Sequence, residues 1–371
     1  MPLINKKAIY HFDFIIPLLL LPFIGISLFL VNEISHHLFK KEIAYIIIGF
    51  ITFFAVFLFP IRKYLWIIPF LYTINILLLL GVDLFGISIL GARRWLKIPI
   101  IGLTIQPSEF MKTTMILMLG YKIYQNPPDE NGYTLKELIK LSAYILLPFI
   151  LIAKEPDLGT ALILLIVGFG TLIIVGIRKK IIINGIIFLL FFIPFAYKFL
   201  LHDYQRDRIN KFLGKPSYHV EQSLIAIGSG GISGKSKEEA TQTQLKFLPI
   251  ASSDFIFAYY VERFGFIGVI VLLGLYFFLV YYLLSYVKYL KNDYFAMPIF
   301  ASVGLMIIVY SYVNISMTIN LAPVVGVPLP FMSHGGTSFI NFMIIFGILE
   351  NLLAFKHEFL YNFNSENSTG L

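Results

Sequence analysis

One carboxylate stands out because of its position along the chain. Asp254 ends a long polar segment, about residues 200–255, and comes just before an apolar run long enough to cross a membrane. At the centre of a membrane helix an aspartate costs roughly 2.5–3.5 kcal/mol on insertion scales, and it costs less at the interface. A carboxylate in this position therefore needs a partner or a chemical task. It could act as a general base or as a metal ligand.

Two further motifs place charge beside apolar runs. Glu109 and Lys112 are three residues apart, so on a helix they share a face and can pair. The pair could simply fix helix packing, or Lys112 could lie near an anionic group of a substrate. Arg93 and Arg94 could face the same substrate, or they could anchor the chain among lipid headgroups.

A third motif is a charged turn between two apolar runs. Lys154, Glu155 and Asp157 flank a proline at this turn. Asp157 is well placed to cap the helix that follows. The alternative is that these charges form a lip over a binding cavity.

Prolines and glycines interrupt the apolar sequence at 320–338. Irregular backbone at membrane depth is tolerated only where it is buried in protein or lines a wet cavity. Ser333 and the pair Gly335-Gly336 precede a predicted helix, where exposed backbone amides suit an anion.

The spacing of two acidic residues gives a geometric expectation. Asp254 and Glu262 are eight residues apart. On one continuous helix both would lie on the same face, with Glu262 about 12 Å deeper at 1.5 Å per residue. We expect Glu262 to pair with Arg263 or Lys112, or to face a polar cavity.

The composition indicates that membrane helices must position these residues. The chain has 371 residues, of which 58% are hydrophobic and 13% are charged, whereas soluble domains carry about 25% charged residues. Apolar runs near the ~20 residues needed to cross a bilayer recur throughout. We predict an all-α polytopic membrane protein with ten spans, at about 14–31, 43–59, 65–81, 104–123, 138–153, 160–176, 181–199, 256–286, 297–318 and 336–355.

Charge distribution sets the expected orientation. Lys and Arg are more frequent in the short loops that face the cytoplasm when the N-terminus is inside, so both termini are predicted to be cytoplasmic. The 200–255 loop and all the charged motifs then lie outside, with a short helix expected at 218–227. The net charge of +8 reflects this topology rather than nucleic-acid binding, and the absence of cysteine excludes disulfides and thiol chemistry.

These groups together favour an anionic amphiphile, such as a lipid diphosphate, as the substrate. Sugar transfer from a lipid diphosphate needs a base for the acceptor hydroxyl and positive charge, or a divalent cation, at the leaving group. A transporter could use the same charges to move the substrate.

Seven stretches in order and spacing resemble the SEDS family of shape, elongation, division and sporulation proteins. They are residues 91–96, 106–112, 155–161, 222–231, 241–249, 254–258 and 328–338. The segment 241–249 is more similar to the elongation branch of the family than to its division branch.

The resemblance implies one SEDS membrane domain over residues 1–371, with ten helices and a large extracytoplasmic loop between helices 7 and 8. It also implies a peptidoglycan glycosyltransferase of the bacterial cytoplasmic membrane that polymerises lipid II during elongation, with its active site facing outside. Asp254 matches the catalytic aspartate, as base or as ligand of a divalent cation, Mg²⁺ or Mn²⁺. Positions matching substrate-site motifs are Lys112, Glu109, Arg93, Arg94, Trp95, Lys154, Asp157 and Ser333.

The same resemblance implies partners for the chain. A class B penicillin-binding protein would supply the transpeptidase, and other elongation-complex proteins would join it, with no nucleic acid involved. Two alternatives stay open: a lipid II flippase, and a non-catalytic scaffold that recruits the penicillin-binding protein.

Overall fold

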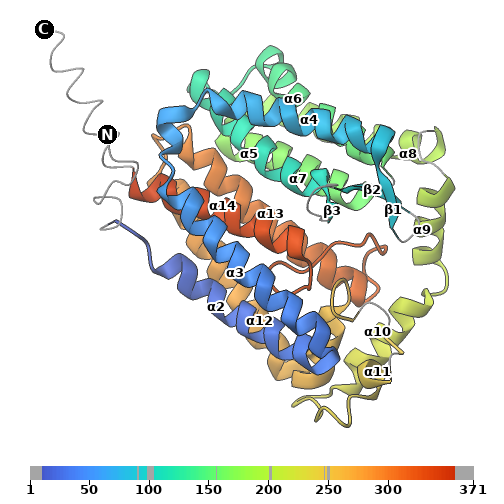
Figure 1. Ribbon diagram of the computed structural model, residues 1–371. Coiled ribbons are helices and arrows are strands. Elements are labelled where there is room, and N and C mark those ends of the chain that lie inside the picture. Colours follow the sequence, from blue (N-terminus) through green and yellow to red (C-terminus); the bar gives the residue numbers. More distant parts are fainter. Residues whose placement is uncertain are drawn as a thin grey trace, which may run out of the picture.

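The computed structural model describes residues 11–89, 92–97, 104–155, 157–199, 203–245, 247–248 and 251–355. These residues form a bundle of long helices (Figure 1). The start of α2 lies at one end of the bundle, and α10 and α11 lie at the other end.

Ten helices of at least 19 residues occur within the described residues, one for each predicted span. They are α2 Ile15–Ile34, α3 His36–Leu58, α4 Ile67–Phe85, α5 Pro107–Gln125, α6 Leu135–Lys154, α7 Leu158–Gly176, α8 Lys179–Phe199, α12 Ile256–Tyr289, α13 Ala296–Thr318 and α14 Gly336–Ala354. A short 3-10 helix, Ile61–Tyr64, follows α3.

Eight of the ten are long and apolar enough to cross a membrane. The other two, α5 and α6, carry more polar and charged residues, including the predicted Glu109–Lys112 pair on α5. That all ten helices cross the bilayer stays a prediction.

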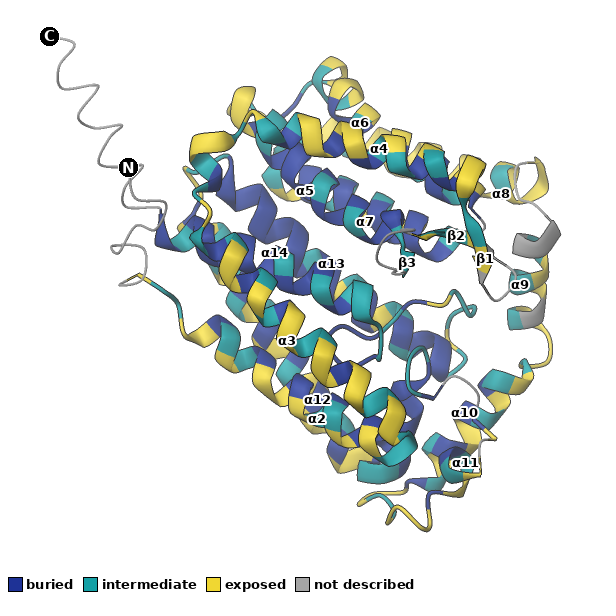
Figure 2. Cartoon of the chain, viewed as in Figure 1, coloured by how far each residue is buried: buried dark blue, intermediate teal, exposed yellow. Residues whose placement is uncertain are grey.

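Burial identifies α13 and α14 as the centre of the bundle. In each of them 72% of the most apolar window is buried, because α3, α5, α7 and α12 pack around them (Figure 2). In α8, by contrast, no residue is buried, so its apolar side chains face the surroundings of the bundle. Lipid accounts for such a surface in a membrane protein.

A small antiparallel sheet between α4 and α5 adds strands to the expected all-helical fold. Its strands, in the order β1-β2-β3, are β1 Ile87–Ile89, β2 Ala92–Lys97 and β3 Thr104–Ile105. The predicted site residues Arg93, Arg94 and Trp95 therefore lie on a strand, β2.

Three helices occur in the described part of the 200–255 segment: α9 Asp203–Leu213, α10 Tyr218–Ser229 and α11 Thr241–Gln244. Helix α10 confirms the short helix expected at 218–227. Its buried face, formed by Val220, Ser223 and Ala226, packs against α12 and α13.

Helix α12 is interrupted at Gly265, whose φ of 61° and ψ of −161° are not helical. The interruption leaves backbone N–H and C=O groups of α12 without helical partners, and the glycine-rich segment 230–235 hydrogen-bonds to them. Phe266 N–H donates to Gly231 O at 2.9 Å, Ile267 N–H donates to Ile232 O at 3.1 Å, and Lys235 N–H donates to Glu262 O at 3.0 Å. The loop before Asp254 is thereby joined to the helix after it.

The interruption predicts a specific sensitivity to substitution. In Gly265→Ala the added Cβ would lie 2.4 Å from Gly234 N, and alanine is disfavoured at this φ and ψ. We expect a loss of stability of about 1–3 kcal/mol or more, seen as a lower thermal unfolding midpoint in detergent.

Gly274→Ala is the matched control because Gly274 lies on the same helix and its added Cβ has nothing within 4 Å. This variant should unfold at or slightly above the wild-type temperature. Equal midpoints for the two variants would contradict the structural role of the interruption.

Candidate active site

Asp254 lies in a turn at residues 251–255, and α12 begins only at Ile256. The expectation that Asp254 and Glu262 share one face of a continuous helix is therefore wrong. The turn leads into the helix without belonging to it, so the spacing of eight residues does not translate into helical geometry.

Three consecutive carbonyls of this turn accept hydrogen bonds from the α13–α14 region. Ser252 O accepts from His334 N–H at 2.8 Å, Ser253 O accepts from Ser333 Oγ at 2.7 Å, and Asp254 O accepts from Asn314 Nδ2 at 2.9 Å. We call these three contacts the carbonyl clamp. Because each peptide unit is planar, fixing the carbonyls restricts the direction in which the Asp254 side chain can leave the turn.

The donors of the carbonyl clamp are themselves held in place. Ser333 Oγ accepts a hydrogen bond from Leu329 N–H at 2.7 Å, and Asn314 Nδ2 also donates to Val327 O at 2.7 Å. The irregular backbone predicted at 320–338 is confirmed, with positive φ at Asn320, Gly326 and Phe331. At Gly326 the backbone comes so near to Asp254 that an added Cβ would lie 3.5 Å from its Oδ2.

The Asp254 carboxylate is partly exposed, and no hydrogen bond from the described residues to it is found. Burial raises its pKa, Arg94 opposes that rise, and Asp157 adds to it. A free carboxylate with a raised pKa is a better proton acceptor than an ordinary exposed aspartate.

Arg94 connects strand β2 to the turn before α7. Its Nε donates to Glu155 O at 3.2 Å, and its NH1 lies 3.5 Å from Asp157 Oδ1. Asp157 caps α7 as predicted by accepting from Thr160 N–H at 3.3 Å, and it also accepts from Gln106 Nε2 at 3.2 Å. The structure thus places Arg94 and Asp157 together and within electrostatic reach of Asp254.

The predicted pairing of Glu109 and Lys112 is confirmed at 2.7 Å between Oε1 and Nζ, and both side chains are buried. Lys112 also hydrogen-bonds Tyr310 OH on α13. The pair therefore joins α5 to α13. Arg94 and Asp157, rather than Lys112, are the charged groups that act on Asp254.

The remaining predicted site residues lie on β2 and at the end of α6. Arg93 is exposed and donates to Gly86 O and Leu84 O, which holds the sheet against the end of α4. Trp95 is half-buried on β2 opposite Ile87. Lys154 is exposed at the last residue of α6.

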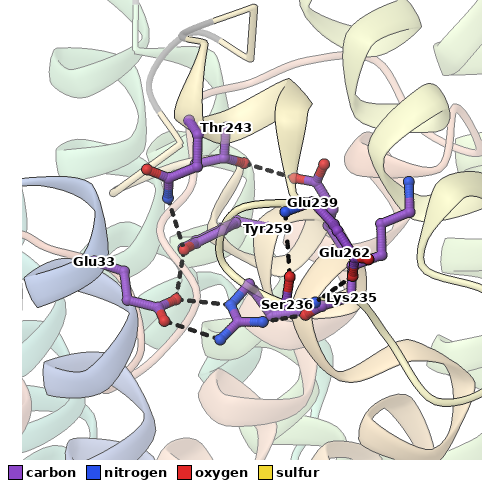
Figure 3. Close-up of polar contacts among 9 residues, drawn as sticks. Glu33, Lys235, Ser236, Glu239, Thr243, Tyr259 and Glu262 are labelled. Atoms are coloured by element: carbon purple, nitrogen blue, oxygen red, sulfur yellow. Dashed lines mark hydrogen bonds and ion pairs between the residues drawn. The ribbon is translucent and has the colours of Figure 1, made fainter.

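Glu262 is fully buried, and its side chain binds the loop at residues 242–243 (Figure 3). Its carboxylate accepts from Gln242 N–H at 3.1 Å and from Thr243 Oγ1 at 2.9 Å. The expected partner Arg263 pairs instead with Glu33 on α2, at 2.8 Å between Nε and Oε2. Tyr259 donates to the same Glu33 at 2.6 Å, so the network ties α2, α12 and the loop together.

The described residues do not form a protein cage for a metal ion, because no group of three or more His, Cys, Asp or Glu side chains is placed to hold one there. Asp157 already pairs with Arg94 and accepts hydrogen bonds from Gln106 and from the Thr160 amide of α7. Asp254 is thus one available ligand. It fits only an ion whose other ligands come from elsewhere, as Mg²⁺ often takes one or two carboxylates plus substrate phosphates.

Sequence reasoning missed Asn314, which contributes directly to the carbonyl clamp. The available signal was an amide side chain inside the apolar run at 297–318. A neutral amide in a membrane helix needs hydrogen-bond partners, as an ionisable group does.

The chain matches known proteins over most of its length. The family model of the FtsW/RodA/SpoVE cell cycle proteins matches residues 9–358. Peptidoglycan glycosyltransferase MrdB of Helicobacter pylori is 52% identical over 97% of this chain and 94% of its own length. MrdB of Escherichia coli is 36% identical over 94% of this chain and 96% of its own length.

Two solved structures share the fold. A chain from a structure titled for the coordination of polymerization and crosslinking by a peptidoglycan synthase complex superposes with a TM-score of 0.78 at 22% identity, covering 93% of this chain and 98% of that one. The crystal structure of Thermus thermophilus rod shape determining protein RodA gives a TM-score of 0.68 at 22% identity, covering 93% and 97%.

The carbonyl clamp predicts that Asn314→Ala lowers activity as well as stability. It leaves the carbonyls of Asp254 and Val327 without their donor, and misplacement of a catalytic group by about 1 Å can cost about 100-fold in rate. We expect the reaction rate to fall by about 10- to 100-fold.

Asn351→Ala is the matched control, since Asn351 Nδ2 likewise donates to two backbone carbonyls, those of Phe57 and Phe59. The two variants should lose similar thermal stability, but Asn351→Ala should keep its activity per folded molecule. Equal activity in both would contradict the positioning role of Asn314.

Proposed function

The chain belongs to the FtsW/RodA/SpoVE family of cell cycle proteins and is a peptidoglycan glycosyltransferase, and from this premise we propose that Asp254 is its general base. The observation that carries the proposal is a carboxylate with a raised pKa, held by its backbone and left free of hydrogen bonds from described residues. The substrate is lipid II, polymerised into glycan strands, and we assign the reaction to cell elongation.

In the proposed reaction the acceptor GlcNAc 4-hydroxyl attacks C1 of the donor MurNAc. The O–H bond breaks as the new C1–O bond forms, and the Asp254 carboxylate takes the proton. The bond between C1 and the diphosphate oxygen breaks, and undecaprenyl diphosphate leaves with the electron pair.

Positive charge must stabilise the leaving diphosphate. We assign Arg94 to this task because it is the cation that acts on Asp254. Asp157 orients Arg94 through the 3.5 Å ion pair, and Gln106 and the α7 amide hold Asp157. Ser333 acts through the carbonyl clamp. Substrate contacts by Lys112, Glu109, Arg93, Trp95 and Lys154 stay predictions.

A divalent cation, Mg²⁺ or Mn²⁺, is also a proposal. Asp254 would be one ligand, and the substrate diphosphate would supply further oxygens. Such an ion would neutralise charge on the leaving group. Chelation with EDTA in the polymerisation assay tests this point, and strand formation that continues at full rate would contradict the cation.

The protein is a multi-pass protein of the bacterial inner membrane, acting as one membrane domain over 1–371 with its active site facing outside. One large core cluster of buried residues within the described part of the chain supports the single domain. We further propose that the chain works with a class B penicillin-binding protein and other elongation proteins. A shared fold with a chain of a peptidoglycan synthase complex supports that assignment.

The decisive test of the proposed base is Asp254→Asn in purified protein with its penicillin-binding partner. The amide cannot accept the proton, so the rate of strand formation from lipid II should fall by about 100- to 10,000-fold. Polymer length and rate are read by gel electrophoresis of labelled lipid II.

Asp207→Asn is the control because it makes the same change at an exposed carboxylate on α9. It should leave the rate of strand formation unchanged. Normal strand growth by Asp254→Asn would show that Asp254 is not the base, and movement of lipid II across liposomes without polymer would favour the flippase.

A further inference from the structure

Glu155 is a buried acid that the proposed reaction does not use. It follows the last residue of α6, its side chain is 2% exposed, and neither Oε1 nor Oε2 has a hydrogen-bond partner among the described residues. An ionised carboxylate in such a place is costly unless it is paired, and a buried polar group without a partner calls for an explanation.

The charged groups that act on Glu155 come from three elements. Asp157 lies before α7, Asp83 lies on α4, and Arg94 lies on β2. Lys154, its neighbour on α6, is exposed. Two of the three are carboxylates, so the surroundings oppose a further negative charge at this position.

Burial, and then the two carboxylates, raise the pKa of Glu155 to about 8, although Arg94 opposes the rise. At neutral pH the side chain is therefore mostly protonated in the folded protein, and it ionises as the pH passes through about 8. The pKa of Glu155 rises because burial and nearby negative charge disfavour the ionised form of a carboxylic acid.

The backbone of Glu155 already binds the arginine that serves the site. Glu155 O accepts from Arg94 Nε at 3.2 Å, while the guanidinium also reaches Asp157. A backbone carbonyl carries no net charge, so this hydrogen bond from Arg94 to Glu155 O does not neutralise the guanidinium. An ionised Glu155 side chain would place a second carboxylate near the same guanidinium and weaken its attraction for an anionic ligand.

We propose that Glu155 is a positioning residue whose neutral form keeps the charge of Arg94 available to Asp157 and to the diphosphate of the substrate. Its ionisation adds a negative charge beside Arg94 and weakens substrate binding. The inference rests on the proposed function, because it takes a lipid diphosphate as the ligand. Substrate binding by the enzyme should therefore weaken at alkaline pH, and the group responsible, Glu155, takes no part in the proton transfer.

The test is the pH dependence of KM and kcat for lipid II, between pH 7 and pH 9, in the complex with the penicillin-binding partner. Wild-type KM should rise by up to about tenfold over this range, since the protonated fraction of a group titrating near pH 8 falls from about nine-tenths at pH 7 to about one-tenth at pH 9. In Glu155→Gln, which is neutral throughout, KM should stay flat. A rise in KM rather than a fall in kcat separates binding from chemistry.

Glu350→Gln is the matched control. Glu350 is also fully buried with an unpartnered oxygen, Oε2, but it lies about 21 Å along α14 from Gly336 at 1.5 Å per residue. This variant should keep the wild-type rise in KM.

Each outcome decides the proposal. A flat wild-type KM, or an equal rise in wild type and Glu155→Gln, overturns it, and the wild-type profile suffices if the variant does not fold. Absence of polymer at every pH would instead overturn the proposed function.

Discussion

The candidate site depends on three hydrogen bonds to one turn. Asp254 precedes α12 and so lacks the regular backbone pairing of a helix interior. The carbonyl clamp replaces it with donors from His334, Ser333 and Asn314. Asn314 lies on α13, and Ser333 and His334 lie just before α14; these two helices are the most buried of the candidate membrane helices. A carboxylate on a turn becomes well positioned because the rigid centre of the protein holds its backbone.

The loop on the N-terminal side of this turn is also held by contacts with the helix bundle. The loop that leads to Asp254 is joined to α12 where Gly265 interrupts the helix, and buried Glu262 binds the loop at Gln242 and Thr243. Glu33 and Arg263 extend this attachment to α2. The carboxylates of this region thus divide by environment. Glu262 and Glu33 are satisfied and structural, whereas Asp254 has no hydrogen bond from described residues and is available for chemistry.

Much of this could be predicted from the sequence, because the relevant physics is local. Apolar length predicted the ten long helices, helical spacing predicted the Glu109–Lys112 pair, and capping preference predicted the role of Asp157. What failed depended on tertiary context. Asp254 and Glu262 were assigned to one helical face because sequence spacing does not reveal that α12 starts at Ile256. Strand β2 was missed because its pairing partners define it, and Asn314 was missed because its partners are distant carbonyls.

We propose that the Asp254 carboxylate, under the influence of Arg94, accepts the proton in glycan transfer. The most direct measurement is the acid limb of the pH profile of kcat, compared between wild type and Arg94→Gln. Arg94 holds the pKa of Asp254 below the value that burial alone would give. A base must be deprotonated to act, so activity is lost as the pH falls through that pKa. We expect the acid limb to move to higher pH in Arg94→Gln; an acid limb that stays in place or moves to lower pH would show that Asp254 under Arg94 is not the proton acceptor.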